Sequence, residues 1–199
     1  MTTLKTGTVV DETTWNSPNF TPEDSVPAVF GRPRSTGRIT IHHWGADGQG
    51  FDAVCNYLSR PGGNSSAHFV VEAGRVACLV EPKNAAWHSG SAEGNATSIG
   101  IECRPEMSEG DINEVVALIE WLEDVYGPQE IWLHREWSST ACPGRYANMR
   151  DEIVRCVNVL QGTSGESSAP APATVDRMAV IRAELAEIRA SAATIEGQL

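Results

Sequence analysis

The chain has 199 residues, with 15 basic and 26 acidic side chains and a formal net charge of −11. This length suits one well-buried domain with an appendage and is too short for two ordinary domains joined by a linker. The negative charge argues against phosphate backbones and anionic membrane surfaces, which excludes nucleic acid as the primary partner. Because no run of 18 apolar residues occurs, we also expect no membrane insertion.

The first seven residues lack both the apolar core and the cleavage site of a secretory signal. The chain has five cysteines, an odd number without paired spacing, which is typical of reduced thiols. We therefore expect a protein that is made and folded in a cytoplasm.

Residues 1–37 are rich in Thr, Pro, Asn and Ser and contain the spaced aromatic residues Trp15, Phe20 and Phe30. Disordered tails are poor in aromatic residues. We therefore predict an extended N-terminal arm that these rings hold on the surface of the domain.

Residues 38–161 alternate between strand-like and helix-like patterns. In chain order we predict a strand at 38–44, a helix at 51–60, a hairpin at 67–72 and 75–80, a strand at 97–103, a helix at 108–126, a strand at 131–134 and a helix at 145–161. The helix at 108–126 has a clear start, because Ser108 and Asp111 have the spacing of a capping box. The alternation predicts an α/β domain with a central mixed β-sheet flanked by helices.

Residues 162–174 have the Ser, Gly, Ala and Pro composition of a linker. Apolar residues between Met178 and Leu199 then recur at alternating steps of three and four, which is a heptad pattern. We predict an amphipathic heptad helix at 175–199 and a homo-oligomer formed through residues 178–199. The alternative is a helix folded back on the domain.

His134 ends an apolar strand, and Cys142 follows eight residues later, directly before Pro143 and Gly144. Proline suits the first position of a helix, and a helix N-terminus lowers the pKa of a thiol. His42 or His43 offers a third ligand, although only one of two adjacent strand residues can face a metal. Three His and Cys ligands with an open position are typical of catalytic zinc.

Five motifs in order resemble the zinc-dependent N-acetylmuramoyl-L-alanine amidases of the amidase-2 and peptidoglycan recognition protein superfamily, most of all the phage endolysins. The match runs from about residue 38 to residue 160. The motifs are Ile41-His42-His43, Ser66-Ala67-His68-Phe69, Trp87-His88-Ser89-Gly90, Thr97 to Glu102 and His134 to Gly144.

The resemblance implies that His42, His134 and Cys142 hold the zinc ion. It implies that Glu102 is the general base and that Thr140 stabilises the oxyanion. It also implies a substrate-binding groove for the muramyl peptide, lined by His68, Trp87, His88 and Asn95.

Two positions depart from the family pattern. Ala67 stands where some relatives have a catalytic tyrosine, which would place more of the chemistry on Glu102. Thr140 stands where other relatives have lysine, so one neutral hydrogen bond replaces a charge.

The resemblance implies cleavage of the amide bond between N-acetylmuramic acid and L-alanine in bacterial peptidoglycan. It implies a phage endolysin that accumulates in the host cytoplasm and reaches the cell wall at lysis. Three alternatives stay open: a cytoplasmic amidase that recycles soluble muropeptides, a non-catalytic peptidoglycan-binding module, and a cysteine peptidase that uses Cys142 and His134.

Overall fold

The structure is a computed structural model that describes residues 2–162. The predicted heptad helix at 175–199, its oligomer seam at 178–199 and all but the first residue of the predicted linker at 162–174 lie outside the described residues.

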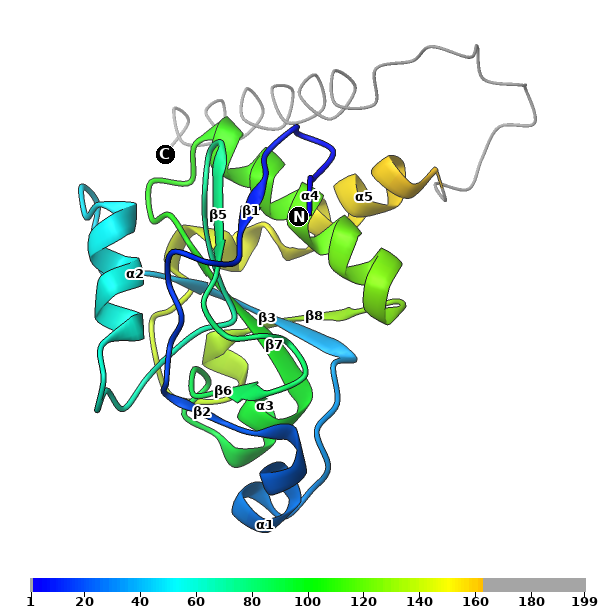
Figure 1. Cartoon of the computed structure of the whole chain (residues 1–199). Helices are drawn as coiled ribbons and strands as arrows, with labels where there is room; N and C mark the ends of the chain where they lie inside the picture. Colours follow the sequence, from blue (N-terminus) through cyan, green and yellow to red (C-terminus); the bar gives the residue numbers. More distant parts are fainter. Residues whose placement is uncertain (1, 163–199) are drawn as a thin grey trace.

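Six strands form the central sheet in the order β1-β5-β4-β7-β3-β8 (Figure 1). Strands β4, β7, β3 and β8 are parallel, whereas β5 pairs antiparallel with β4 and parallel with β1. This arrangement confirms the predicted mixed sheet. The strand bounds are β1 Val10–Asp11, β3 Arg38–His43, β4 Phe69–Glu72, β5 Arg75–Cys78, β7 Ser98–Cys103 and β8 Glu130–Leu133.

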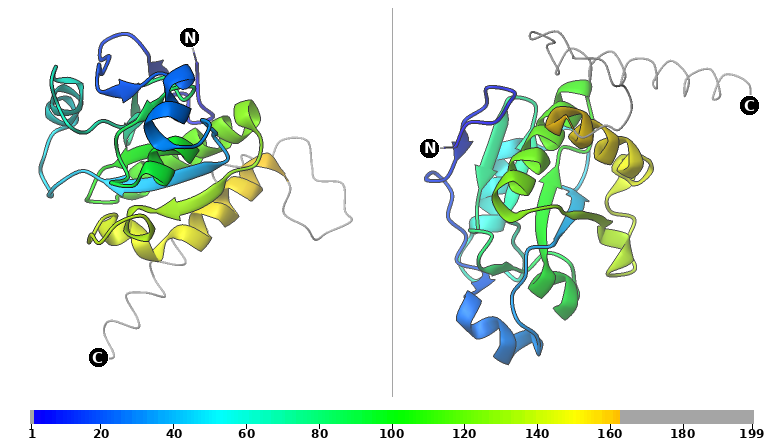
Figure 2. Two further views of the ribbon diagram at one scale, coloured as in Figure 1. Left: turned by 90° about the horizontal axis from the view of Figure 1, so that it is seen from below. Right: turned by 90° about the vertical axis from the view of Figure 1, so that its right-hand side faces the viewer.

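The two faces of the sheet are covered by different helices (Figures 1 and 2). Helices α4 (Glu109–Tyr126) and α5 (Arg150–Gln161) pack together on one face and form the main core with alternate residues of the strands. Helix α2 (Phe51–Ser59) packs on the other face with a smaller core that includes Val70 of β4. Strand β4, which has residues in both cores, is therefore buried on both faces.

The first turn of α4 matches the prediction. The Ser108 hydroxyl accepts a hydrogen bond from the backbone N–H of Asp111, and the Asp111 carboxylate accepts one from the backbone N–H of Ser108. These reciprocal bonds satisfy two N–H groups that a helix start otherwise leaves without partners.

The last predicted helix is wrong at its start. Residues 145–161 do not form one helix, because a 3-10 helix, η3 (Gly144–Asn148), precedes α5, which begins at Arg150. Met149 between them has an ψ angle of 2°, outside the α-helical range. The buried side chain of Tyr146 anchors η3, and its hydroxyl donates a hydrogen bond to the carbonyl of Arg104.

The N-terminal arm has more regular structure than the sequence predicts. It contributes β1 to the central sheet, pairs β2 (Phe20–Thr21) with β6 (Ala85–Ala86), and continues into the 3-10 helix η1 (Glu23–Ser25) and helix α1 (Val26–Phe30). Trp15 packs edge-on against Phe51 of α2, with ring centroids 5.8 Å apart. Trp15 thus holds the arm against α2, and backbone pairing holds it as well.

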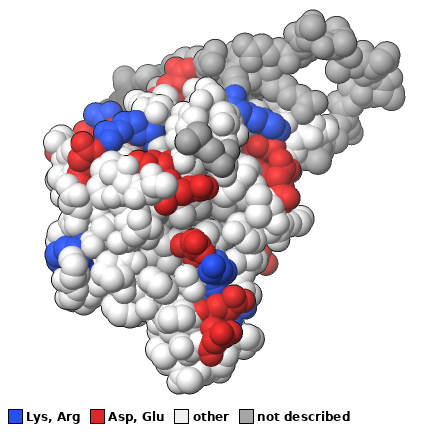
Figure 3. All heavy atoms as spheres, in the orientation of Figure 1, with Lys and Arg blue, Asp and Glu red and all other residues white. Residues whose placement is uncertain are grey.

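Helix α3 (Ala92–Thr97), between β6 and β7, has no counterpart in the predicted elements. None of the helices within residues 2–162 has the length and apolar character that crossing a membrane needs. Acidic and basic side chains alternate on the face seen in Figure 3, without a continuous basic surface.

Candidate metal centre and active site

Three potential metal ligands meet at the carboxyl ends of β3 and β8. One ligand atom from each of His42, His134 and Cys142 lies within 4.8 Å of the other two. In particular, Cys142 Sγ is 3.8 Å from His42 Nδ1. Ligand atoms around a tetrahedral zinc ion lie about 3.3–3.8 Å apart, given Zn–N and Zn–S bonds of about 2.0–2.3 Å. The distance of 3.8 Å between Cys142 Sγ and His42 Nδ1 lies within this range.

The two histidines reach this point from neighbouring strands. His42 is the fifth residue of β3, and His134 directly follows β8 and opens the 3-10 helix η2 (His134–Glu136). Their ring centroids are 4.3 Å apart. His134 Nδ1 is buried and has no hydrogen-bond partner among the described residues. A buried nitrogen without a partner is costly by itself, and a metal ion would satisfy it.

Burial keeps both imidazoles neutral. It lowers the pKa of His42 well below its usual value, and the neighbouring His88 and His134 lower it further. Burial also lowers the pKa of His134. A neutral imidazole is the form that binds a metal, so the histidines are ready as ligands at neutral pH.

The structure corrects the expectation for Cys142. Pro143 is not the first residue of an α-helix, because η3 is a short 3-10 helix that starts at Gly144. No α-helix N-terminus therefore lowers the pKa of the Cys142 thiol. Burial, and next the nearby Glu102, instead raise that pKa to about 12. The thiolate thus needs a nearby cation, and a coordinated metal ion supplies one.

Glu102 lies beside His42 on the neighbouring strand. The parallel register of β3 and β7 pairs His42 with Glu102. The Glu102 side chain is half-buried, and its Oε2 is buried without a hydrogen-bond partner among the described residues. Burial raises the pKa of Glu102 to about 7. A carboxylate with that pKa can take up and release a proton near neutral pH.

A buried hydrogen-bond chain fixes which nitrogen of His42 faces Cys142. The Ser98 hydroxyl donates to the Gly94 carbonyl at 2.7 Å, so His88 Nε2, 3.4 Å away, donates to Ser98 Oγ. His88 Nδ1 must then accept from His42 Nε2, at 2.9 Å. This leaves the lone pair of His42 Nδ1 directed at the metal position. Such a partner behind a ligand orients the ring and sets its tautomer.

The same chain reaches the loop that carries His134. Thr40 donates to Ser98 Oγ at 2.8 Å and accepts from the indole N–H of Trp137 at 2.9 Å. Gly100 leaves the space for the His88 ring, since a Cβ atom there would lie 2.5 Å from His88 Cγ. The ring of His88 is therefore confined from the sheet side as well.

One of the three potential ligands, His134, and the Glu102 carboxylate border a cavity of about 420 Å³, which we call the metal cavity. His43, His88, Glu102 and His134 line it, and Tyr57 and Leu58 of α2 form part of the opposite wall. His43 does not join the ligand group; its backbone N–H lies 3.3 Å from Cys142 Sγ and donates to the sulfur.

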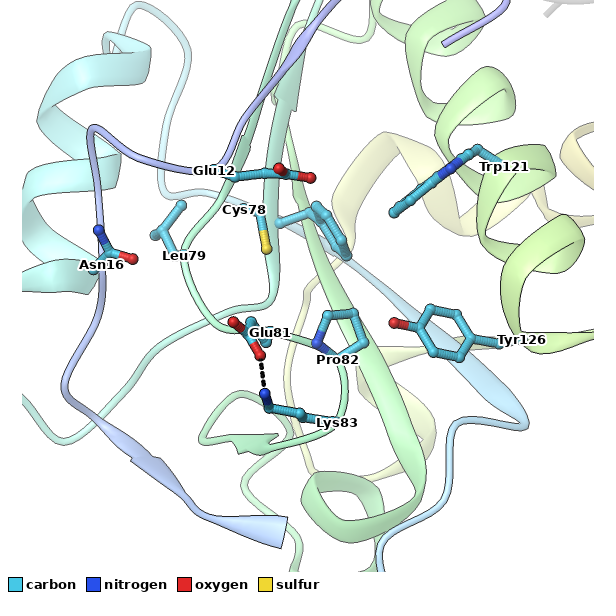
Figure 4. Close-up of a pocket in the computed structure, with 10 residues that line it drawn as sticks. Glu12, Asn16, Cys78, Leu79, Glu81, Pro82, Lys83, Trp121 and Tyr126 are labelled. Atoms are coloured by element: carbon cyan, nitrogen blue, oxygen red, sulfur yellow. Dashed lines mark ion pairs between the residues drawn. The ribbon is translucent and has the colours of Figure 1, made fainter. Parts of the chain in front are cut away.

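A second cavity, of about 330 Å³, lies on the α4 side of the sheet (Figure 4). Trp121 and Tyr126 extend into it from α4, and an ion pair of 2.5 Å between Glu81 and Lys83 borders it. It contains no histidine. Within residues 2–162, the only group of three His, Cys, Asp or Glu ligands spaced for a metal is His42, His134 and Cys142.

Comparisons with known proteins identify the family. The model of the Amidase_2 family, described as N-acetylmuramoyl-L-alanine amidase, matches residues 32–145. This range is more than half of the chain and includes His42, Glu102, His134 and Cys142.

The chain belongs to the Amidase_2 family.

Individual relatives agree with this assignment. N-acetylmuramoyl-L-alanine amidase XlyA of Bacillus subtilis (strain 168) is 30% identical over 125 residues, which cover 58% of this chain and 42% of XlyA. The chain thus spans less than half the length of that relative.

Two solved structures share the fold at lower identity. A mutant endolysin from Bacillus subtilis has a TM-score of 0.59 and 21% identity, and the match covers 75% of this chain and 99% of the endolysin chain. The Staphylococcus aureus hydrolase AmiA, in complex with its ligand, has a TM-score of 0.60 and 16% identity over 82% of this chain and 88% of AmiA. Both confirm the predicted mixed α/β architecture.

The structure places Thr140 beside the metal ligands. Its hydroxyl accepts a hydrogen bond from the backbone N–H of Cys142 at 3.2 Å. The hydroxyl hydrogen stays free to donate to another group. The predicted oxyanion role needs a donor of this kind.

The four residues expected to bind substrate occupy different environments. Trp87 and Asn95 line an open groove next to the metal cavity. His88 borders the metal cavity but is mostly buried against His42. The predicted substrate contact of His68 is wrong, because its side chain is 0% exposed and bonds to the backbone of Gly100 and Asn84.

The sequence analysis did not predict that His88 is the hydrogen-bond partner of His42. These residues are 46 positions apart, and no local pattern predicts their hydrogen bond. A weak signal does exist in Gly100, a glycine in the interior of an apolar strand, which often marks a close approach of another group.

Proposed function

We propose that the protein is a zinc-dependent N-acetylmuramoyl-L-alanine amidase. The reaction is hydrolysis of the amide bond between the lactyl group of N-acetylmuramic acid and L-alanine of the peptidoglycan stem peptide. The observation that carries this proposal is the grouping of three ligand atoms at the edge of a cavity that His134 and Glu102, with its unpartnered carboxylate oxygen, border. Membership of the Amidase_2 family supports the choice of bond.

The ligands in this proposal are His42, His134 and Cys142. When bound, zinc supplies Lewis-acid polarisation of the scissile carbonyl and makes a water molecule more acidic. Two imidazoles and one thiolate are ligands that zinc prefers, and they leave a position open for substrate. The unpartnered His134 Nδ1 supports this assignment.

Glu102 moves the proton in this scheme. Its ionised carboxylate accepts a proton from the attacking water and then delivers it to the nitrogen of L-alanine as the amide bond breaks. Thr140 donates its hydroxyl hydrogen to the carbonyl oxygen, on which negative charge develops. With alanine at position 67, Glu102 is the acid–base group that this scheme uses.

We further propose that the protein acts as a phage endolysin, made in the host cytoplasm and reaching bacterial peptidoglycan at lysis. The likeness to an endolysin from Bacillus subtilis supports this role. The elevated thiol pKa of Cys142 favours zinc chemistry over a cysteine peptidase, whose nucleophile is the thiolate.

Mass spectrometry of purified sacculi digested with the full chain tests the proposal. We expect stem peptides with new L-alanine amino termini, loss of this product with a chelator, and its return with added zinc. Wall binding without new termini would instead identify a binding module. Cleavage restricted to soluble muropeptides would indicate recycling, and inactivation by alkylation without any effect of chelation would indicate a cysteine peptidase.

A further inference from the structure

An open groove of about 550 Å³ lies next to the metal cavity. Consecutive residues of the chain line the two hollows. Gly63 and Asn64 line the groove, and the next two residues, Ser65 and Ser66, line the cavity. In the same way Trp87 lines the groove and His88 lines the cavity. A substrate bound at the metal centre can therefore extend into the groove.

The N-terminal arm forms one wall of this groove. Val29 and Phe30 of α1 line it, together with Thr21 of β2. Residues 1–31 precede the matched family region. This wall is thus a feature of the present chain that the family match does not cover.

The arm wall is held firmly in place. Val26 of α1 is fully buried in a small core with Ala85 and Ala96. Thr21 accepts a hydrogen bond of 3.0 Å from the indole N–H of Trp87, which joins the two walls. Farther along, the Arg34 guanidinium donates to the carbonyls of Ala96 and Ser98, each at 3.0 Å, and so fixes the exit of α1. Because of these contacts the groove is preformed.

The groove and the metal cavity together form one surface, and an exposed apolar side chain lies at each end of it. Among the large hydrophobic side chains of residues 2–162, Val29 and Tyr57 are the most exposed, at 59% and 54%. Val29 lines the groove and Tyr57 lines the metal cavity. Exposed apolar groups that border neighbouring cavities are typical of a binding surface. The surface runs from α2, past the metal centre, to α1.

The groove lining has no charged side chain. Its ten residues are Thr21, Val29, Phe30, Gly63, Asn64, Trp87, Gly90, Ser91, Ala92 and Asn95. The stem peptide carries carboxylates and amines, which would gain no partner here. An N-acetylated hexosamine is neutral, has an apolar ring face, and carries hydroxyl and acetamido groups.

The polar groups of the groove suit such a sugar. Asn95 Oδ1 is already used by the backbone N–H groups of His88 and Ser89, at 3.0 and 2.9 Å, which orients the Asn95 amide. Its amide nitrogen makes no hydrogen bond to other described residues and can donate to a sugar oxygen. The aromatic rings of Phe30 and Trp87 offer apolar surface.

From these observations we propose that the groove between α1 and Trp87 binds the N-acetylhexosamine next to the muramoyl residue that is being cleaved. This inference rests on the proposed amidase function. It makes the glycan chain, and not the peptide alone, part of what the protein recognises. The arm thereby sets a preference for glycan-linked substrate.

Two soluble substrates test the proposal: N-acetylmuramoyl-L-alanyl-D-isoglutamine, and the same compound with N-acetylglucosamine linked to the muramoyl residue. We expect the wild-type protein to have a KM about threefold to tenfold lower for the disaccharide substrate. The variant Val29→Asp places a charge in the neutral groove and should remove most of this difference. Because Val29 is exposed, we expect no loss of folding.

The matched control is Val125→Asp on α4. Val125 is 52% exposed and lies on the helix of the opposite sheet face, so this variant should keep the wild-type KM ratio. Equal KM values for the two substrates in the wild type, or an unchanged ratio in Val29→Asp, would overturn the proposal. Absence of cleavage of both substrates would refute the amidase function. In that case, calorimetric titration with the disaccharide compound tests whether the groove binds the sugar. Tighter binding by wild type than by Val29→Asp supports sugar binding in the groove, and equal binding refutes it.

Discussion

The two faces of β3 and β7 have opposite chemistry. Ile39, Ile41, Ile99 and Ile101 point to one face, where they pack with α4 and α5 and are 0% exposed. The residues between them, Thr40, His42, Ser98, Gly100 and Glu102, belong to the other face, where the hydrogen-bond chain and the metal cavity lie. Successive strand residues alternate between faces, so one pair of strands contributes both to the core and to the candidate active site.

The two faces differ in the interactions that their side chains need. The apolar face needs only close packing. The polar face needs a partner for every buried group, and most have one, as in the chain from Trp137 to His42. The exceptions beside the metal position are His43 Nδ1, His134 Nδ1 and Glu102 Oε2. Unsatisfied buried polar groups are expensive, and here they gather where the proposed chemistry takes place.

Adjacent substitutions on β7 should separate the two faces most strongly. We expect Glu102→Gln to lower kcat by about 10²–10⁴-fold, because it removes the general base, while zinc is retained. Ile101→Ala should instead lower the free energy of unfolding by about 2–5 kcal/mol, because it leaves a cavity in the core. Steady-state kinetics, zinc analysis and urea unfolding measure the three quantities. Full activity of Glu102→Gln would refute the role of Glu102.

Cys142→Ser should weaken zinc binding by about a hundredfold or more, since a hydroxyl is a far poorer ligand than a thiolate. Competition with a fluorescent zinc chelator measures the affinity. Cys78→Ser is the matched control, because Cys78 is a half-buried cysteine outside the metal cavity. Equal zinc affinities of the two variants would exclude Cys142 as a ligand.

His88→Ala should weaken zinc binding by about 10–100-fold, because His42 loses the partner that orients it. His88→Gln, whose amide can both accept and donate, should recover part of the affinity. The comparison is His68→Gln, which alters a buried histidine bonded to backbone groups. This variant should lower the melting temperature of the metal-free protein, and it should change the zinc affinity less than His88→Ala does. A wild-type affinity in His88→Ala would contradict this positioning role.

The pH dependence should reveal Glu102 in two ways. The base must be ionised, so kcat/KM should fall about tenfold per pH unit below the pKa of Glu102 in the zinc-loaded protein, which the cation lowers from the metal-free value of about 7. The free energy of unfolding should change with pH in the opposite direction: it should decrease as the pH rises. The folded-state pKa lies above the unfolded value, so neutral Glu102 favours the folded state of the metal-free protein at low pH, and this contribution is lost as the pH rises through 7.

Pairing kinetic profiles with thermal melts of the metal-free protein checks both signs. Glu102→Gln should remove the loss of stability between about pH 4.5 and pH 7 and melt higher than wild type at pH 8. An identical pH dependence of melting in variant and wild type would show that Glu102 titrates elsewhere.

Local sequence patterns were enough to predict much of the fold. The capping box at Ser108 and Asp111, the hairpin around Gly74 and the alternating strands each depend on residues close in sequence. The meeting of His134 and Cys142 with one of the two histidines 42 and 43 also followed from local motifs, and the family resemblance selected His42. What these residues share is a pattern that can be read without knowing the tertiary structure.

The parts that sequence did not predict depend on distant contacts. The start of α5 was misplaced because Tyr146 packs into the core and reaches Arg104 from a 3-10 helix. The expected low pKa of Cys142 was wrong because the predicted α-helix terminus is absent and burial raises the thiol pKa. The order of the arm comes from pairing with β5 and β6, far along the chain.

The parallel register that sets His42 opposite Glu102 has a geometric consequence. Neighbouring strands lie about 4.8 Å apart in every sheet, because backbone hydrogen bonds fix that spacing. The separation between the Cα atoms of His42 and Glu102, the proposed first ligand and proton acceptor, is therefore a property of the backbone. Substitutions in the surrounding loops can reshape the substrate surface while this distance stays constant.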